Sequence, residues 1–136
     1  MREILFRGKP LGKLHGKFIY GSLGVIDTDL CAIYHYHRFE FKADEMQLVD
    51  IGTVGQYTGL KDKNGNKIFE GDIVERLWLG EKHIYRIYYD NDIASFIGKD
   101  IYGLNFTTFD YDACEFEVIG NIYDNPELLE VEEWLN

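Results

Sequence analysis

Residues 71–97 read GDIVERLWLGEKHIYRIYYDNDIASFI and hold the most regular pattern in the chain. Short runs rich in β-branched and aromatic residues alternate there with turn residues, first at Gly80 and Glu81 and then at residues 90–92. A spacing of about 8–12 residues continues beyond this stretch and is typical of a small barrel of SH3-like or similar type. The expected strands are residues 73–79, 83–89, 93–97, 102–109 and 115–123.

The N-terminal part of the chain is also rich in strand patterns. Residues 31–42, CAIYHYHRFEFK, alternate with a period of two and predict one long strand. Shorter strands are expected at residues 2–7, 17–20, 46–51 and 53–57. The run Gly21-Ser22-Leu23-Gly24 is interpreted as the end of the second of these.

The predicted fold is therefore mainly β. A small SH3-like barrel formed by the C-terminal half is expected to pack with an N-terminal antiparallel β region. We treat residues 1–136 as a single domain with sub-regions 1–55 and 56–136, because a chain of this length is usually one domain.

One helix is predicted, at the C-terminal end. Asn125 is a suitable N-cap, Pro126 falls at N1, where its missing N–H has no cost, and Glu127 favours the positive end of the helix dipole. An apolar stripe with a tryptophan beside it follows, formed by Leu128, Val131, Leu135 and Trp134.

The charge of the chain is unevenly distributed. It has 14 Lys and Arg against 24 Asp and Glu, a formal charge of -10, and residues 100–136 contain no Lys or Arg. This balance disfavours a protein that wraps a nucleic-acid backbone. The acidic C-terminal end and the basic first strand are instead candidate interfaces, through Asp124, Glu127, Glu130, Glu133, Trp134, Arg2 and Arg7.

Other sequence features bear on location. No apolar run approaches the length of about 18–20 residues that spans a bilayer, and the N-terminal stretch lacks the apolar core of an export signal. We therefore expect a cytoplasmic protein that does not contact the membrane, with Cys31 and Cys114 as reduced thiols.

The segment from residue 56 to residue 74 predicts tight turns. Asn64 and Gly65 favour a hairpin with a type I′ turn, and Gly59 and Gly71 are placed where positive φ is needed. Four apolar residues of the segment are expected in the core: Ile68, Phe69, Ile73 and Val74.

A calcium loop beginning at Asp62 is excluded by the same segment. Asp62, Asn64 and Asn66 occupy positions 1, 3 and 5 of such a loop. Position 6, which requires glycine, is Lys67, and position 12, which requires a bidentate glutamate, is Ile73.

A weak metal candidate lies on the predicted strand 31–42. Cys31, His35 and His37 share a face there, and two histidines at i and i+2 on a strand can reach one ion. The alternative is that they pack beside Ile33 and Phe39. Because the sequence identifies no fourth ligand, we expect neither a metal nor another cofactor.

Catalytic patterns are poorly supported. Neither Ser22 nor Ser95 lies in a G-x-S-x-G motif, which argues against a nucleophile elbow. Glu115 and Glu117 alternate with apolar residues and are expected on the outward face of a strand, where a solvated role is more common than catalysis. The sequence therefore does not indicate an enzyme.

Three blocks of the chain resemble one known family. MREILFRG (residues 1–8), QYTGLKDKNGNKIFEGDIV (residues 56–74) and IGNIYDNPELLE (residues 119–130) are similar to the YopX family. The resemblance implies a largely β fold and an origin in phages and prophages of Gram-positive bacteria. It carries no catalytic motif, and the role of the family is not established.

Together these patterns favour an accessory module that binds a host or phage protein, with self-association as one way of doing so. Tyrosine and tryptophan are enriched at protein interfaces, and an acidic surface attracts a basic partner. The alternative is a nucleic-acid-binding protein or an acidic DNA mimic that acts on a host protein.

Overall fold

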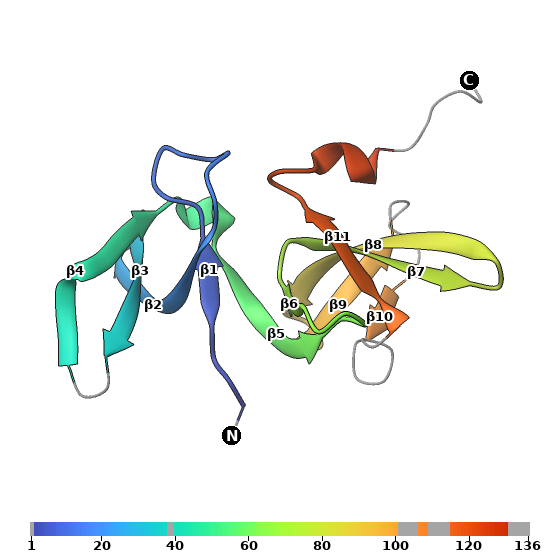
Figure 1. Cartoon of the computed structure of the whole chain (residues 1–136), viewed down its shortest axis with the longest axis horizontal. Helices are drawn as coiled ribbons and strands as arrows, with labels where there is room; N and C mark the ends of the chain where they lie inside the picture. The colour runs from blue at the N-terminus through green and yellow to red at the C-terminus, as the bar shows by residue number, and fades with distance from the viewer. Residues whose placement is uncertain (1, 38–39, 101–105, 109–114, 131–136) are drawn as a thin grey trace. The chain divides into compact units, whose positions relative to one another are not determined.

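The computed structural model describes residues 2–37, 40–100, 106–108 and 115–130, with side chains throughout except at 35–37, 40–45 and 106–108 (Figure 1). The chain divides into two compact units, Met1–Tyr57 and Thr58–Asn136. In the ranges just given, strands predominate and the helical segments are short 3-10 turns. The predicted mainly β fold is confirmed.

The first unit is an antiparallel sheet with the strand order β4-β3-β2-β1-β5. The end of β4, at one edge of this sheet, also pairs with the chain that follows β1. The Leu11 N–H donates to the Leu48 carbonyl at 3.0 Å, and the Asp50 N–H donates to the Lys9 carbonyl at 2.9 Å. The sheet therefore curls back on itself. Its elements are β1 (Phe6–Gly8), β2 (Ile19–Asp27), β3 (Leu30–His37), β4 (Glu40–Val49), η1 (Ile51–Thr53) and the start of β5 (Gly55–Lys61).

The prediction of one long strand at residues 31–42 is wrong. β3 and β4 form a hairpin in which Tyr36 lies opposite Phe41 and His37 lies opposite Glu40. The residues between the two strands, 38 and 39, lie outside the described residues. The sequence hides this hairpin because the whole stretch contains no Gly, Pro, Asn or Asp to signal a turn.

The predicted strand end at residues 21–24 is also wrong, because these residues lie inside β2. A Cβ on Gly21 would lie 2.5 Å from the Tyr34 carbonyl oxygen, and a Cβ on Gly24 would lie 2.7 Å from the Tyr34 ring. These glycines therefore allow β3 to approach closely, a role that glycine takes inside strands.

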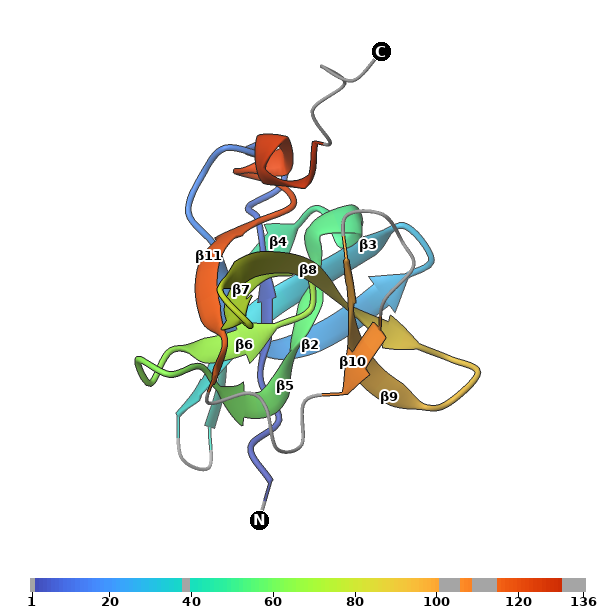
Figure 2. The same ribbon diagram turned by 90° about the vertical axis from the view of Figure 1, so that its right-hand side faces the viewer.

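The second unit contains a five-stranded antiparallel sheet with the order β10-β9-β8-β7-β11, curled into a half-barrel (Figure 2). Each of the five strands predicted from residue 73 onward overlaps one of these. The end of β5 pairs with β6 in the same unit. The further elements are β6 (Lys67–Phe69), β7 (Asp72–Trp78), β8 (Glu81–Asp90), β9 (Ser95–Asp100), β10 (Phe106–Thr108), β11 (Glu117–Asn121) and η3 (Pro126–Leu129).

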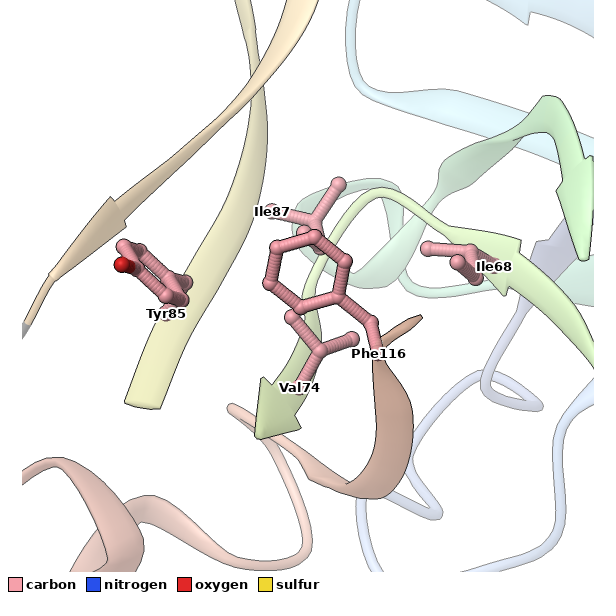
Figure 3. Packing of buried hydrophobic residues seen from close by; sticks show 5 residues of the cluster. All are labelled: Ile68, Val74, Tyr85, Ile87 and Phe116. Atoms are coloured by element: carbon pink, nitrogen blue, oxygen red, sulfur yellow. The ribbon is translucent and has the colours of Figure 1, made fainter. Parts of the chain in front are cut away.

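The core of the second unit surrounds the ring of Phe116, which is fully buried (Figure 3). Tyr85 meets this ring edge-on with the centroids 5.7 Å apart. The remaining buried members of the cluster are Ile68, Val74 and Ile87. All four apolar residues expected in the core from residues 68–74 are buried, which confirms that prediction.

Gly71 connects the core strands. Its φ of +88° and the +90° of Gly59 confirm the predicted positive values. The Gly71 N–H donates to the Ile87 carbonyl, and its own carbonyl accepts from the Ile122 N–H, both at 2.9 Å. This turn therefore joins β8 to the chain that follows β11.

The predicted C-terminal helix is wrong as far as the structure describes it. Pro126–Leu129 form a single 3-10 turn, with i to i+3 bonds from Leu128 to Asn125 and from Glu130 to Glu127. Asn125 does not cap it, because its Oδ1 accepts the Asn121 N–H at 3.2 Å. Glu130 is already extended, and residues 131–136 lie outside the described part.

The core of the first unit is smaller. Cys31, Ile33 and Val49 are buried together, with half-buried apolar residues packed around them. Among the residues that the structure describes, no helix is long and apolar enough to cross a membrane.

Candidate functional site

Of the three side chains in the predicted metal candidate, the structure describes that of Cys31. Cys31 is buried, with its Sγ 3.9 Å from the Val49 carbonyl oxygen, and burial raises the pKa of its thiol. A metal-binding cysteine must instead be deprotonated. The side chains of His35 and His37 lie outside the described set. Where side chains are described, no cluster of three His, Cys, Asp or Glu residues could hold a metal ion.

The turn between β5 and β6 is organised by the buried carboxylate of Asp62. Its Oδ1 accepts the N–H groups of Asn64 and Asn66 at 2.9 and 2.8 Å. Its Oδ2 accepts the Val118 N–H at 2.9 Å and the Asn66 side-chain amide at 3.4 Å. Both oxygens thus bind N–H donors, and the carboxylate links the turn to β11.

These hydrogen bonds determine the ionisation of Asp62. Burial alone would raise its pKa, but the hydrogen bonds from Val118, Asn66 and Asn64 together outweigh burial and lower it. The carboxylate is therefore held in its charged form, as expected where N–H groups donate to a carboxylate.

The hairpin predicted at Asn64 and Gly65 exists, but its predicted turn type is wrong. The Gly65 N–H donates to the Asp62 carbonyl at 3.0 Å, and only Gly65 has positive φ, at +83°. Asp at the first position and Gly at the fourth position are typical of a type I turn. The side chain of Asp62 favours this turn over the type I′ alternative, because it bonds the backbone two and four residues ahead.

The turn with two consecutive positive φ values lies elsewhere, between β7 and β8. Leu79 has φ of +52° and Gly80 has φ of +81°. Trp78 and Glu81 are paired directly across these two residues. Two central residues with positive φ are the signature of the type I′ hairpin turn, which strongly prefers Asn or Gly over leucine.

This hairpin exposes a run of apolar side chains. Leu77 is 67%, Trp78 50% and Leu79 88% exposed. We call these three residues the apolar tip. Sequence analysis missed it, although the signal was present as three large apolar residues directly before Gly80.

Arg76 joins the apolar tip to the core. Its guanidinium carbon lies 5.3 Å from the Trp78 ring centroid and 5.0 Å from that of Phe116. Both distances are within the range of cation–π attraction. Glu115 lies 4.0 Å from the guanidinium, so the charge of Arg76 also has an acidic neighbour.

Three of the acidic residues predicted as an interface lie on a folded segment at and beside η3. Asp124, Glu127 and Glu130 are all exposed. We call these three residues the acidic turn. Asn121 holds the segment in place, because its Oδ1 accepts the Asp124 N–H at 2.9 Å and its Nδ2 donates to Asp124 Oδ2 at 3.0 Å. Glu133 and Trp134 lie outside the described residues.

The two arginines predicted as the basic part of the interface differ in their exposure. Arg2 is exposed, whereas Arg7 is only 5% exposed. The guanidinium carbon of Arg7 lies 4.0 Å from the Phe18 ring centroid, and the Lys9 Nζ lies 4.3 Å from the same ring. The side chain of Arg7 therefore packs inside the first unit and is not part of an exposed basic surface.

The carboxylates of Glu117 in β11 and of Glu115, two residues before it, have structural neighbours. Glu115 is exposed and Glu117 half-buried, on either side of the buried Phe116, in agreement with the predicted outward face. Glu117 lies 3.4 Å from the Lys63 Nζ. These contacts are typical of solvated ion pairs on a sheet surface.

Comparison with known proteins gives one family and one fold. The family described as "YopX protein" matches residues 24–130. No curated protein matches the chain. A crystal structure of protein EF1440 from Enterococcus faecalis is similar, with a TM-score of 0.59 and 23% identity over 96% of this chain and 100% of the other. At that identity, the similarity shows the fold alone.

Proposed function

The chain belongs to the YopX family, and from this premise we propose that it is a non-enzymatic accessory protein, encoded by a phage or prophage, that binds another protein. The observation that carries this proposal is the acidic turn. Asp124, Glu127 and Glu130 are exposed on a segment held by hydrogen bonds within its own unit. These bonds hold the backbone segment that carries the three carboxylates.

An exposed acidic surface selects its partner by charge. The chain as a whole carries a formal charge of -10. Charge of one sign steers a partner of the opposite sign and raises the association rate, which falls as salt is added. The proposed partner therefore presents a basic surface. Self-association through the N-terminal strand is the less favoured arrangement, because Arg7 is buried.

Charge reversal on the acidic turn tests the proposal. The variant Glu127→Lys/Glu130→Lys is compared with Asp29→Lys/Asp92→Lys, which makes the same charge change at exposed positions in two other turns. Each protein is used as bait in lysate of the producing bacterium at about 50 and 300 mM salt. We expect a partner that is retained by the control, lost from the acidic-turn variant and released at high salt.

The outcome against the proposal is equally clear. Equal capture by the two variants would show that the acidic turn does not contribute to binding. A salt-dependent oligomer of the purified protein that the acidic-turn variant fails to form would assign the surface to self-association instead.

The same acidic surface supports a second candidate, an acidic mimic of nucleic acid. Such a mimic captures a DNA-binding host protein but does not itself bind DNA. A gel-shift assay with the purified chain, alongside identification of the captured protein, separates it from the other cases. A shift of the DNA band by the chain alone would indicate a nucleic-acid-binding protein.

A further inference from the structure

The apolar tip is an unusual place for three large apolar side chains. Scattered exposed apolar residues are ordinary, but a contiguous group marks an interaction site. Leu77, Trp78 and Leu79 are consecutive and each is at least half exposed. They lie at the end of the β7–β8 hairpin, where the chain turns back on itself.

The backbone conformation of Leu79 also indicates an interaction site. Leu79 occupies a left-handed conformation, with φ of +52°, in a turn where Asn or Gly would be free of strain. Leucine is thus disfavoured here both by its backbone and by its exposure to water. A residue that is unfavourable for the folded chain in two ways suggests a function for the side chain.

The hairpin holds the tip in a defined position. Strand pairing is regular from Ile73 opposite Arg86 to Trp78 opposite Glu81. The Trp78 ring is backed by Arg76, which also contacts the core ring of Phe116. An aromatic side chain ordered before binding loses less freedom on association, which favours its use as an anchor.

We propose that the apolar tip is a preformed anchor that inserts into an apolar pocket on a partner protein, with Trp78 and Leu79 as the inserted side chains. This inference rests on the proposed protein-binding function and adds the kind of site that the partner must present. The two cations nearest the tip each have an acidic neighbour, with Lys82 3.9 Å from Glu75 and Arg76 4.0 Å from Glu115. The exposed side chains of the tip itself are apolar, so apolar contact is the interaction they offer.

The small size of the tip and the charge of the chain favour a different protein as the binding partner. A stable dimer buries about 800 Å² per partner, more than three side chains supply, so the tip acts as the centre of a larger contact. A second copy is disfavoured because each chain carries a charge of -10. An anionic membrane surface would repel the chain for the same reason.

Substitution of Leu79 provides the sharpest test. Leu79→Asn and Leu79→Gly both remove the apolar side chain and introduce a residue that accepts positive φ. Neither variant is therefore expected to lose stability. Ile93→Asn is the matched control, because Ile93 is 58% exposed at the neighbouring β8–β9 turn. A photo-crosslinking residue at position 77 of the full chain identifies the partner in lysate.

The crosslinked partner is then purified and its affinity is measured. We expect both Leu79 variants to weaken binding at least tenfold and Ile93→Asn to change it less than twofold. Unchanged affinity of the Leu79 variants, or no crosslinked protein at position 77, would overturn the inference. If the acidic-turn variant loses the partner while the Leu79 variants keep it, the protein-binding function stands and the anchor is wrong.

Two further outcomes reassign the tip. Flotation of the chain with phosphatidylcholine and phosphatidylglycerol vesicles, abolished by Leu79→Asn, would show a membrane contact. Oligomers in sedimentation velocity that Leu79→Asn disperses would show a second copy as the occupant. Either result would overturn the assignment to a partner's pocket.

Discussion

Two tight turns of the second unit connect antiparallel strands with opposite kinds of residue. The β5–β6 turn uses Asp62 and Gly65, residues that favour turns, and it binds both oxygens of a buried carboxylate. The β7–β8 turn places Leu79 at positive φ and leaves the side chain 88% exposed. Local preference and structure agree in the first turn and conflict in the second.

This difference separates architecture from interaction. A turn whose residues match its geometry and whose polar groups are all bonded contributes to stability, and it needs no partner to explain it. A turn that keeps an unfavourable residue at the surface is where a functional requirement is expected. The contrast makes stability measurements informative, because the two turns should respond to substitution with opposite signs.

The largest expected effect is at Asp62. In Asp62→Ala, the N–H groups of Val118, Asn64 and Asn66 lose their acceptor. Each buried donor left without a partner costs about 1–3 kcal/mol, and these are partly buried, so we expect a loss of about 3–5 kcal/mol. Urea denaturation measures the change in the free energy of unfolding.

The control for this prediction is Asp27→Ala. Asp27 also accepts a backbone N–H two residues ahead, from Asp29 at 2.8 Å, but its turn is exposed. We expect a loss of below about 1 kcal/mol there. Similar losses in the two variants would mean that the Asp62 network contributes nothing beyond an ordinary surface turn.

The sequence predicted the second unit better than the first for a physical reason. The turns near Gly71, Gly80 and residues 90–92 contain residues that stop strands locally, so a local pattern locates them. The β3–β4 hairpin has no such residues. Gly21 and Gly24 were mistaken for a stop, because their reason for being glycine is the approach of Tyr34 from another strand.

The candidate surfaces show the same limit. The exposure of the acidic turn followed from charge alone, which a sequence shows directly. The predicted helix failed because Asn125 bonds to Asn121 instead of capping, and the position of Arg7 depends on the ring of Phe18. The apolar tip was missed because its exposure depends on the register of β7 against β8.

The second largest effect is expected for Asp62→Asn, and it depends on pH. The amide replaces one carboxylate oxygen, so one of the paired acceptors is lost and the expected cost is about 2 kcal/mol at pH 7. The pKa of Asp62 is lowered in the folded state, so its charged form stabilises the fold above the unfolded-state pKa of about 3.9. This contribution is lost as the pH falls below that value.

The stability difference between the original chain and Asp62→Asn should therefore be constant from about pH 7 to pH 5 and shrink below pH 4. Urea denaturation at several pH values measures it. A difference that grows on acidification would contradict the lowered pKa, because it would mean that folding favours the protonated carboxyl.

A smaller loss is expected for Gly65→Ala in the same turn. Gly65 has φ of +83° and no atom within 4 Å of an added Cβ, so the cost comes from the backbone alone. A left-handed alanine costs about 1–2 kcal/mol. Gly52→Ala is the matched control, since it has equal space and no positive φ. Equal stability of the two variants in urea would remove this conformational argument.

The smallest expected effect, and the one with opposite sign, is at Leu79. Leu79→Gly removes a left-handed cost of about 1–2 kcal/mol. It adds about 0.5–1 kcal/mol, because glycine gains freedom in the unfolded chain. The net expectation is a gain of about 0.5 kcal/mol, seen as a rise in Tm of about 1–3 °C.

Leu77→Gly makes the identical replacement two positions earlier, at an exposed strand residue without positive φ. At position 77 the greater freedom of glycine in the unfolded chain is the only contribution, so we expect a loss of stability of about 0.5–1 kcal/mol. The sign of the difference between these two variants decides the comparison of the turns. If both lose stability equally, Leu79 is not strained and its exposure alone supports the anchor. If only Leu79→Gly gains stability, the chain keeps at position 79 a leucine that its own fold disfavours.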